Sequence, residues 1–383
     1  MSGKRRAAAL ALAATTMLAA GCGSASSHAV APAAHLSQSL NTSLAIGATT
    51  WAVVPMGAPS GANLFWQLFA LPGSGSRWVL ETPPDIATNG AIAVAASGGL
   101  SVVAGVRPSL DLTFSPITST ANGGRSWGAG PPAGALADVP DALAASPDGS
   151  QLIALFARGR AARADLSGTS WSTLATERSL AATAAGRACG LTALTAAAYS
   201  TAGLALLGGN CSRAGQAGVF AGSAGHWQAA GPALPGALAG QQTQLLRLAR
   251  TARGDVALLQ AGTGQHADLL AAWTTGHGRW TLSPPFSLHS AQVVSTSFGS
   301  DGATGIVLTG GQAETIAGPG SSWQALPKLP SGHTVTLALP AAGQVEALAA
   351  TGGRLTVWRA APGAADWAQA QVIKVAIPYG SSS

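Results

Sequence analysis

The sequence predicts an all-β protein in which seven four-stranded antiparallel sheets, or blades, close into a ring, the architecture of a β-propeller. Three recurring features predict this fold: a tryptophan after a glycine-rich turn, an apolar run that precedes it, and prolines that follow it. The tryptophans recur every 43–56 residues, which is the period of propeller blades. They are Trp78, Trp127, Trp171, Trp227, Trp280, Trp323 and Trp367.

The apolar runs each start at a glycine about 20 to 30 residues before a tryptophan, which leaves room for two further short strands. They occupy residues 47–54, 99–103, 149–156, 203–207, 254–259, 302–308 and 343–348. Each unit is then expected to hold an apolar inner strand, a middle strand such as 268–274 or 355–359, a glycine turn and a tryptophan strand. Prolines follow five of the seven tryptophans, and they suit the exit from an edge strand because they cannot donate to a ladder.

The seven tryptophans are predicted to be core residues. One sheet cannot cover both of its faces, and stacking sheets in a ring removes apolar area from water at roughly 25 cal/mol per Å². An indole can fill the wedge between neighbouring blades while its N–H reaches a backbone carbonyl. The alternative is a set of exposed rings that stack on carbohydrate.

The composition agrees with one large ring. Charged residues make up 9% of the chain and hydrophobic residues 47%, with 50 glycines and 22 prolines, which is far from the signature of a disordered protein. No long polar linker divides the chain after the first 40 or so residues. We therefore expect a single propeller domain over residues 41–383 and a monomer.

The most regular tryptophan turn is Thr120-Ala121-Asn122-Gly123-Gly124-Arg125-Ser126-Trp127. It resembles the Asp-box (BNR) repeat of sialidase-like and sortilin-like β-propellers, whose pattern is Ser/Thr, any, Asp, any, Gly, any, Ser/Thr, Trp. Asn122 replaces the aspartate, and asparagine can still accept backbone N–H bonds across a tight turn. The other copies keep less of the pattern. In that family the box is a structural hairpin remote from catalysis, so the resemblance implies a fold and no reaction.

The amino terminus has the pattern of an exported protein. Basic residues at 4–6 precede an uncharged run over 7–20, as in a secretory signal, and the run is too short to span a membrane as a helix. Cys22 follows Leu-Ala-Ala-Gly at 18–21, which resembles a bacterial lipobox, although that family prefers a larger aliphatic residue at position 19. The resemblance implies a cleaved signal peptide over 1–21 and a lipid on Cys22. The alternative is an ordinary signal peptide with an incidental cysteine.

A lipid on Cys22 would place the protein outside the cytoplasm, anchored to the bacterial cell membrane. Residues 22–40 are small and polar and suit a flexible tether. The remaining cysteines, Cys189 and Cys211, form an even pair within one repeat, and in an exported protein such a pair predicts a disulfide. Two buried free thiols are the alternative. A metal site is disfavoured because the pair lacks CxxC spacing and a nearby histidine.

The net charge of +6 includes three basic residues of the predicted signal peptide. Without them, 17 basic and 14 acidic residues give +3, which argues against a nucleic-acid partner. Two arginine clusters are interpreted as solvated, charged strand edges, with contact to an anionic ligand or lipid headgroup as the alternative. They are Arg158, Arg160 and Arg163, and Arg247, Arg250 and Arg253.

No catalytic motif emerges, because the chain has neither a phosphate-loop lysine nor a GxGxxG or GxSxG pattern. His266, Asp268 and His277 are interpreted as polar residues of a surface hairpin and not as a metal site. A sialidase would need an arginine cluster, a tyrosine nucleophile with a glutamate, and an acidic proton donor, and only Tyr199 and Tyr379 are available. We expect no catalytic residue, no metal and no cofactor.

Two classes of function remain. The first is a non-catalytic binding or scaffolding propeller that offers its loops to a protein, peptide or glycan. The second is a secreted sialidase-like glycoside hydrolase with its site in the central funnel. Clustered acids at the inner ends of several blades would favour the hydrolase, and an apolar or neutral mouth would favour the binder. The acids are scattered, and we interpret Asp111, Asp148, Asp255 and Asp301 as turn residues. The sequence therefore favours the binder.

Overall fold

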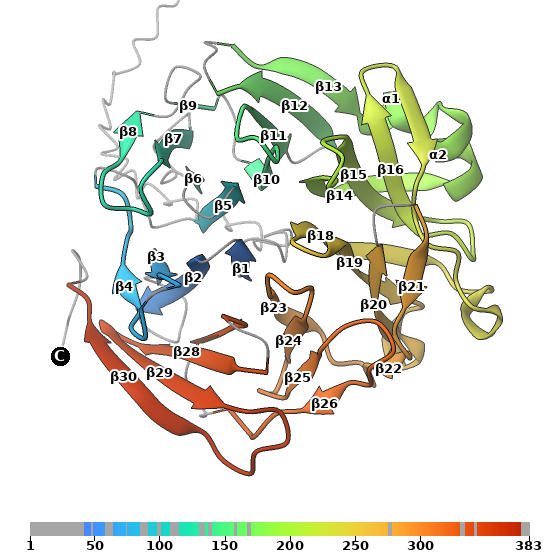
Figure 1. Cartoon of the computed structure of the whole chain (residues 1–383). Coiled ribbons are helices and arrows are strands. Elements are labelled where there is room, and N and C mark those ends of the chain that lie inside the picture. Colours follow the sequence, from blue (N-terminus) through green and yellow to red (C-terminus); the bar gives the residue numbers. More distant parts are fainter. Residues whose placement is uncertain are drawn as a thin grey trace, which may run out of the picture. The chain divides into compact units, whose positions relative to one another are not determined.

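The computed structural model describes residues 42–376, except 47–48, 58–63, 74, 85–90, 98–100, 108–114, 130–134, 137–139, 157–158, 167–169, 275–277, 330–333 and 341–342. The signal peptide, Cys22 and the tether predicted from the sequence lie outside the described residues. Within these ranges the protein is a β-propeller made of antiparallel sheets, with two short helices (Figure 1). No helix there is long and apolar enough to cross a membrane.

Consecutive strands pair in groups of four, each with the order first, second, third, fourth. The first two groups are β1 (Thr42–Ile46), β2 (Thr49–Gly57), β3 (Leu64–Leu71) and β4 (Val79–Leu80), then β5 (Ala91–Ser97), β6 (Ser101–Arg107), β7 (Ser115–Thr120) and β8 (Gly128–Ala129). The next two are β10 (Pro140–Ala145), β11 (Gln151–Phe156), β12 (Arg160–Asp165) and β13 (Ser172–Thr176), then β14 (Leu191–Tyr199), β15 (Ala205–Cys211), β16 (Gly218–Ser223) and β17 (His226–Ala229).

The pattern continues to the end of the described chain. The groups are β18 (Thr243–Thr251), β19 (Gly254–Ala261), β20 (Asp268–Thr274) and β21 (Trp280–Leu282), then β23 (Val293–Phe298), β24 (Thr304–Leu308), β25 (Ala313–Ile316) and β26 (Gln324–Ala325), then β27 (Thr334–Ala338), β28 (Val345–Thr351), β29 (Arg354–Ala360) and β30 (Ala368–Lys374). Two short strands, β9 (Ala135–Leu136) and β22 (Phe286–Ser287), add to β7 and β20. The blade count of seven stays a prediction, because parts of several units lie outside the described residues.

The apolar runs found in the sequence form the second strand of each group, not the innermost strand as expected. A second strand has a hydrogen-bonded neighbour on both sides and a sheet packed against each face, so it is the most apolar strand of its unit. Both β19 and β28 are buried over nearly their whole length. Several innermost strands are rich in alanine, as β5 and β10 are, and alanine gives little strand signal.

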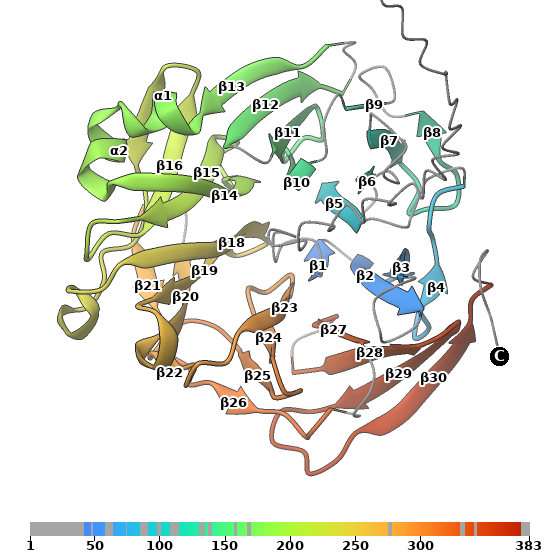
Figure 2. The same cartoon turned by 180° about the vertical axis from the view of Figure 1, so that it is seen from behind.

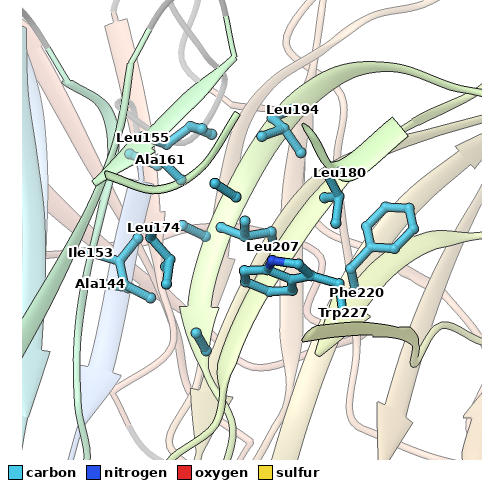
Figure 3. Packing of buried hydrophobic residues seen from close by; sticks show 14 of the residues in the cluster. Ala144, Ile153, Leu155, Ala161, Leu174, Leu180, Leu194, Leu207, Phe220 and Trp227 are labelled. Atoms are coloured by element: carbon cyan, nitrogen blue, oxygen red, sulfur yellow. The ribbon is translucent and has the colours of Figure 1, made fainter. Parts of the chain in front are cut away.

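Neighbouring groups pack face to face through hydrophobic clusters, and the innermost strands gather around the axis of the ring (Figures 1 and 2). One such cluster joins the group β10–β13 to the group β14–β17, where Ile153 and Leu155 meet Leu207, Phe220 and Trp227 (Figure 3). Burial of these faces supplies the apolar contact that a single sheet lacks.

The first and last groups close the ring without sharing a strand. All four strands of the last group are consecutive, and so are those of the first. The two sheets are joined instead by an apolar cluster that contains Val54, Phe69 and Trp78 from one side and Leu348 and Leu355 from the other. At the axis, β1 also pairs in parallel with β23. Side-chain packing closes this ring together with an isolated antiparallel bridge, in which Gly57 and Gly352 exchange two backbone hydrogen bonds of 3.2 Å.

The seven tryptophans lie at or just before the fourth strand of each unit, as predicted. Trp78 and Trp227 are buried, and the other five are half-buried and pack against hydrophobic clusters. Three indoles donate a hydrogen bond to a main-chain carbonyl of the preceding unit, close to the end of its fourth strand. The pairs are Trp280 to Ala230, Trp323 to Pro284 and Trp367 to Pro327. These three indoles thus occupy equivalent wedges between blades.

Two helices and a disulfide form an insertion before β14. Helix α1 (Glu177–Ala181) begins at Thr176, and α2 (Ala184–Cys189) begins at Thr183, each with a threonine side chain that accepts an N–H of the first turn. A disulfide joins Cys189, the last residue of α2, to Cys211 at the end of β15, with the Cα atoms 5.1 Å apart. It ties the insertion to the sheet that it precedes.

Candidate functional site

The innermost strands surround a cavity on the axis of the ring, which we call the central channel. Its lining comes from β1, β5, β10, β14 and β18. The volume that the centre of a water molecule can reach in this cavity is about 70 Å³. This volume is enough for a small chemical group and too small for a helix or a strand. The lining residues are Leu44, 93–96, 142–145, 196–199 and 247–250.

Alanine explains why the central channel exists. Ten of its 17 lining residues are alanine, and a methyl group leaves open the space that larger side chains would fill where several strands converge. Two lining residues carry a charge, Arg247 and Arg250, and no lining residue is acidic. The channel is therefore lined by small side chains and carries positive charge on the strand β18.

Arg247 is the most unusual residue of this lining, because its side chain is buried and its relative exposure is only 6%. Its guanidinium donates to the carbonyl and hydroxyl oxygens of Thr296, both at 3.0 Å, and to the carbonyl of Ser43 at 3.1 Å. It also lies over the ring of Phe298, 4.7 Å from the centroid. Arg247 thus reaches from β18 across the axis to β23 and β1.

No described carboxylate forms an ion pair with Arg247. Burial lowers the pKa of its guanidinium to about 9, so the group still carries its proton at neutral pH. The interpretation of this cluster as a solvated strand edge is therefore wrong for Arg247. Arg253 is exposed as expected, Arg160 lies over the ring of Phe156, and Arg158 is outside the described residues.

Arg250 lies opposite a carboxylate on the neighbouring strand. It pairs across β18 and β19 with Asp255, whose side chain also accepts the Thr201 N–H of the neighbouring unit at 3.0 Å. Burial raises the pKa of Asp255 to about 6, against the opposing effects of that hydrogen bond and of Arg250. Burial also lowers the pKa of Arg250, while the charges of Asp255 and Asp148 raise it.

The acids interpreted as turn residues divide into two kinds. Asp148 accepts the N–H of Ser150, and Asp301 accepts that of Ala303, which confirms the turn interpretation for both. Hydrogen bonds from Ser146 and Ser150 lower the pKa of Asp148 to about 2. Asp255 instead bridges two units, so its assignment to a turn is wrong. Asp111 lies outside the described residues.

Those residues considered for catalysis or metal binding that the structure describes are not assembled into a site. Tyr199 is buried at the channel wall, its hydroxyl is 3.5 Å from Gln151 Oε1, and burial raises its pKa to about 12. Asp268 accepts from Ser287, while His277 and Tyr379 lie outside the described residues. No group of three or more His, Cys, Asp or Glu among the described residues could hold a metal ion.

The turn around Asn122 is held by its side chains. Asn122 Oδ1 accepts the Ser126 N–H at 3.0 Å, and Asn122 Nδ2 donates to the Ser126 hydroxyl at 2.6 Å. The Thr120 hydroxyl accepts the Gly124 N–H at 3.0 Å. Asparagine therefore bridges the turn as expected. Trp127, which follows the turn, contacts Trp51 edge-on, with the ring centroids 6.4 Å apart.

Sequence reasoning did not identify Arg247 as a site residue. One signal was present, since Arg247 stands between Leu246 and Leu248 in an apolar strand. A single charge in such a run indicates a buried, satisfied group or a ligand contact.

No protein-family model and no curated protein matches this chain. Solved structures of similar fold include the periplasmic gluconolactonase PpgL of Pseudomonas aeruginosa, at a TM-score of 0.52 and 14% identity over 84% of this chain and 95% of the other. The GH74 xyloglucanase of Xanthomonas campestris gives 0.52 and 14% over 84% of this chain, which matches 52% of that enzyme. YCF48 bound to a D1 peptide gives 0.46 and 14%, over 81% and 89%. At these identities the likeness shows the β-propeller fold alone.

Proposed function

We propose that this protein is a non-catalytic binding propeller that receives part of its ligand in the central channel. The observation that carries the proposal is the lining of that channel, which holds two arginines and no acid among its described residues. A glycoside hydrolase of the usual kind places two carboxyl groups about 5 to 9.5 Å apart around the scissile bond. This lining offers no such pair.

Two candidate acids, Asp148 and Asp255, do not supply the missing pair. Asp148 is engaged by Ser146 and Ser150 within its own turn, and Asp255 is engaged by Arg250 and Thr201. Two of the structures of similar fold are named as enzymes, but a likeness at 14% identity brings no catalytic residue to this chain. The binding function is therefore favoured over the sialidase-like one.

We place this binding domain outside the cytoplasm, tethered to the bacterial cell membrane by a lipid on Cys22. The signal-like segment before Cys22 and the Cys189–Cys211 disulfide both support an oxidising, exported environment. A flexible tether over 22–40 would span roughly 25 Å, which leaves the ring free to meet a protein, peptide or glycan near the membrane. The resemblance of its best turn to an Asp-box supports the same family of exported propellers.

The anchor is tested by mass spectrometry of the membrane-extracted protein. The expected N-terminal peptide begins at acylated Cys22, and a Cys22→Ser variant should lose both the modification and the membrane fraction. An unmodified peptide that starts elsewhere would exclude the anchor.

The binding function is tested by crosslinking in cells, followed by affinity purification of the anchored protein. The expected result is a defined partner that is captured reproducibly by the wild-type chain. Release of sugar from a panel of glycans by the purified protein, abolished by Tyr199→Phe, would contradict the non-catalytic function and favour the hydrolase.

A further inference from the structure

We propose that Arg247 is the anchor of a binding site for a monovalent carboxylate in the central channel. This inference rests on the proposed binding function and names the chemistry of the ligand group. It starts from an unbalanced charge: a guanidinium that lines a cavity, is buried, and has neutral partners in Thr296, Ser43 and Phe298.

The unbalanced charge is the first argument for a ligand. Burial of an ion is costly unless an opposite charge lies beside it, and no described carboxylate pairs with this one. The three hydrogen bonds of Arg247 account for three of the five N–H donors of a guanidinium. An anion in the channel would supply the counter-charge and an acceptor for the remaining donors.

The count of charges favours a monovalent anion. Arg250, the other cation of the lining, already lies opposite Asp255, which leaves Arg247 as the lining cation that no described carboxylate matches. A dianion such as phosphate would leave one negative charge in the channel without a counter-charge. A carboxylate matches both the single charge and the planar fork of the guanidinium.

A purely structural role is the alternative. Arg247 could serve only to join β18 to β1 and β23, in which case the protein would need the side chain for stability and would bind no anion. The two roles differ in one measurement, because only a binding site responds to added carboxylate at constant ionic strength.

The experiment uses the full mature chain in detergent and titrates it with sodium acetate by calorimetry and by the shift in Tm. Sodium chloride holds the ionic strength constant, and sodium sulfate is the divalent comparison. The expected result is saturable acetate binding, weaker sulfate binding, and at least about a tenfold loss of acetate affinity, equal to about 1.4 kcal/mol, in Arg247→Met. Arg253→Met, an exposed arginine of the same hairpin, should bind acetate like the wild type.

Several outcomes would overturn the site. These are no saturable acetate binding to the wild type, equal binding by Arg247→Met, or sulfate binding tighter than acetate. If Arg247→Met does not fold, Arg247→Lys is the second variant. It keeps the positive charge without the planar guanidinium, so it should lose acetate affinity while it retains a cooperative unfolding transition. Saturation-transfer NMR on acetate with the wild-type chain then decides whether the anion binds at all.

Two larger probes separate the possible sources of the carboxylate. N-acetylglycine represents a peptide carboxyl terminus, and glucuronate represents a sugar acid. The probe with the lower Kd identifies the source of the carboxylate. The experiments distinguish a failure of the carboxylate site from a failure of the proposed binding function. Loss of acetate binding with the crosslinked partner still captured would reject the carboxylate site alone, whereas saturable acetate binding without any captured partner would reject the binding function as proposed.

Discussion

The indole Nε1 of Trp78 donates to the carboxylate of Glu346 at 2.5 Å, across 268 positions of sequence. Gln371 adds two bonds to the main chain of the same tryptophan, at 2.8 Å to its N–H and 2.9 Å to its carbonyl. Trp78 belongs to the first unit, and both partners belong to the last. These contacts hold the ring closed in place of a shared strand, and Arg359 balances the charge of the buried Glu346.

Trp78→Phe is expected to weaken this closure. Phenylalanine keeps most of the apolar ring but removes the N–H, which deprives the fully buried Glu346 of a donor. Loss of a hydrogen bond to a buried charged group costs about 1 to 3 kcal/mol in the free energy of unfolding, measurable by urea denaturation. The matched control is Trp323→Phe, which loses a bond to a main-chain carbonyl at 3.2 Å in a more exposed wedge and should cost less. Equal costs would mean that the closure has no special role.

The tryptophan repeat predicted the ring and the position of the indoles between blades. It could not predict the contact of Trp78 with Glu346 and Gln371. A backbone carbonyl was expected for each indole. Trp280, Trp323 and Trp367 confirm it, whereas the buried Nε1 of Trp171 has no hydrogen-bond partner among the described residues. Trp78 differs because its preceding neighbour is the last unit of the chain. The identity of that neighbour depends on how the ring closes, which no local pattern contains.

The site was less predictable than the fold. Arg247, Arg250 and Arg253 recur at every third position, and that spacing suggests one exposed edge. Arg247 and Arg250 lie on the innermost strand β18, and Arg253 lies in the turn that follows it. The register of β18 shifts between Leu245 and Arg247, so alternation does not tell which side chains face inward. As a result the three arginines have three environments: buried, half-buried and exposed.

Asp255 is expected to make stability depend on pH between about 4 and 6. Its folded pKa of about 6 lies above the ordinary value, so the folded state holds this proton more tightly than the unfolded state does. The resulting stabilisation is complete below pH 4 and is lost as the pH rises through 6, by roughly 1 to 3 kcal/mol. Arg250 is the charged group that opposes the shift. Asp255→Asn should flatten this part of the stability profile in urea titrations.

Asp148 provides a control of opposite sign. Its folded pKa of about 2 lies below the ordinary value, so its contribution is complete above pH 4 and is lost as the pH falls toward 2. Asp148→Asn should therefore change the profile only on the acid side. If Asp255→Asn left the region from pH 4 to 6 unchanged, the burial assigned to that carboxyl would be wrong.

Removal of the disulfide is expected to lower stability without changing the fold. Cys189 and Cys211 are separated by 22 residues, and closure of such a loop restricts the unfolded chain by about 3 kcal/mol on the entropy model. The double variant Cys189→Ser and Cys211→Ser should show this loss in urea denaturation, and non-reducing peptide mapping of the wild type should recover the linked peptides. Recovery of two alkylatable thiols under denaturing conditions would contradict the bond.

Asn122 offers a test of how the tryptophan turn is held. Asn122→Ala removes the acceptor for the Ser126 N–H and the donor to its hydroxyl, so it should cost about 1 kcal/mol, as the loss of a comparable cap does. Asn122→Asp keeps the acceptor, and the Ser126 hydroxyl can turn to donate, so its unfolding free energy should stay within about 0.5 kcal/mol of the wild type. Thermal unfolding of the two variants at one pH measures the difference. Equal destabilisation by alanine and aspartate would mean that the shape of the amide, and not its oxygen, holds the turn, and would weaken the resemblance to an Asp-box.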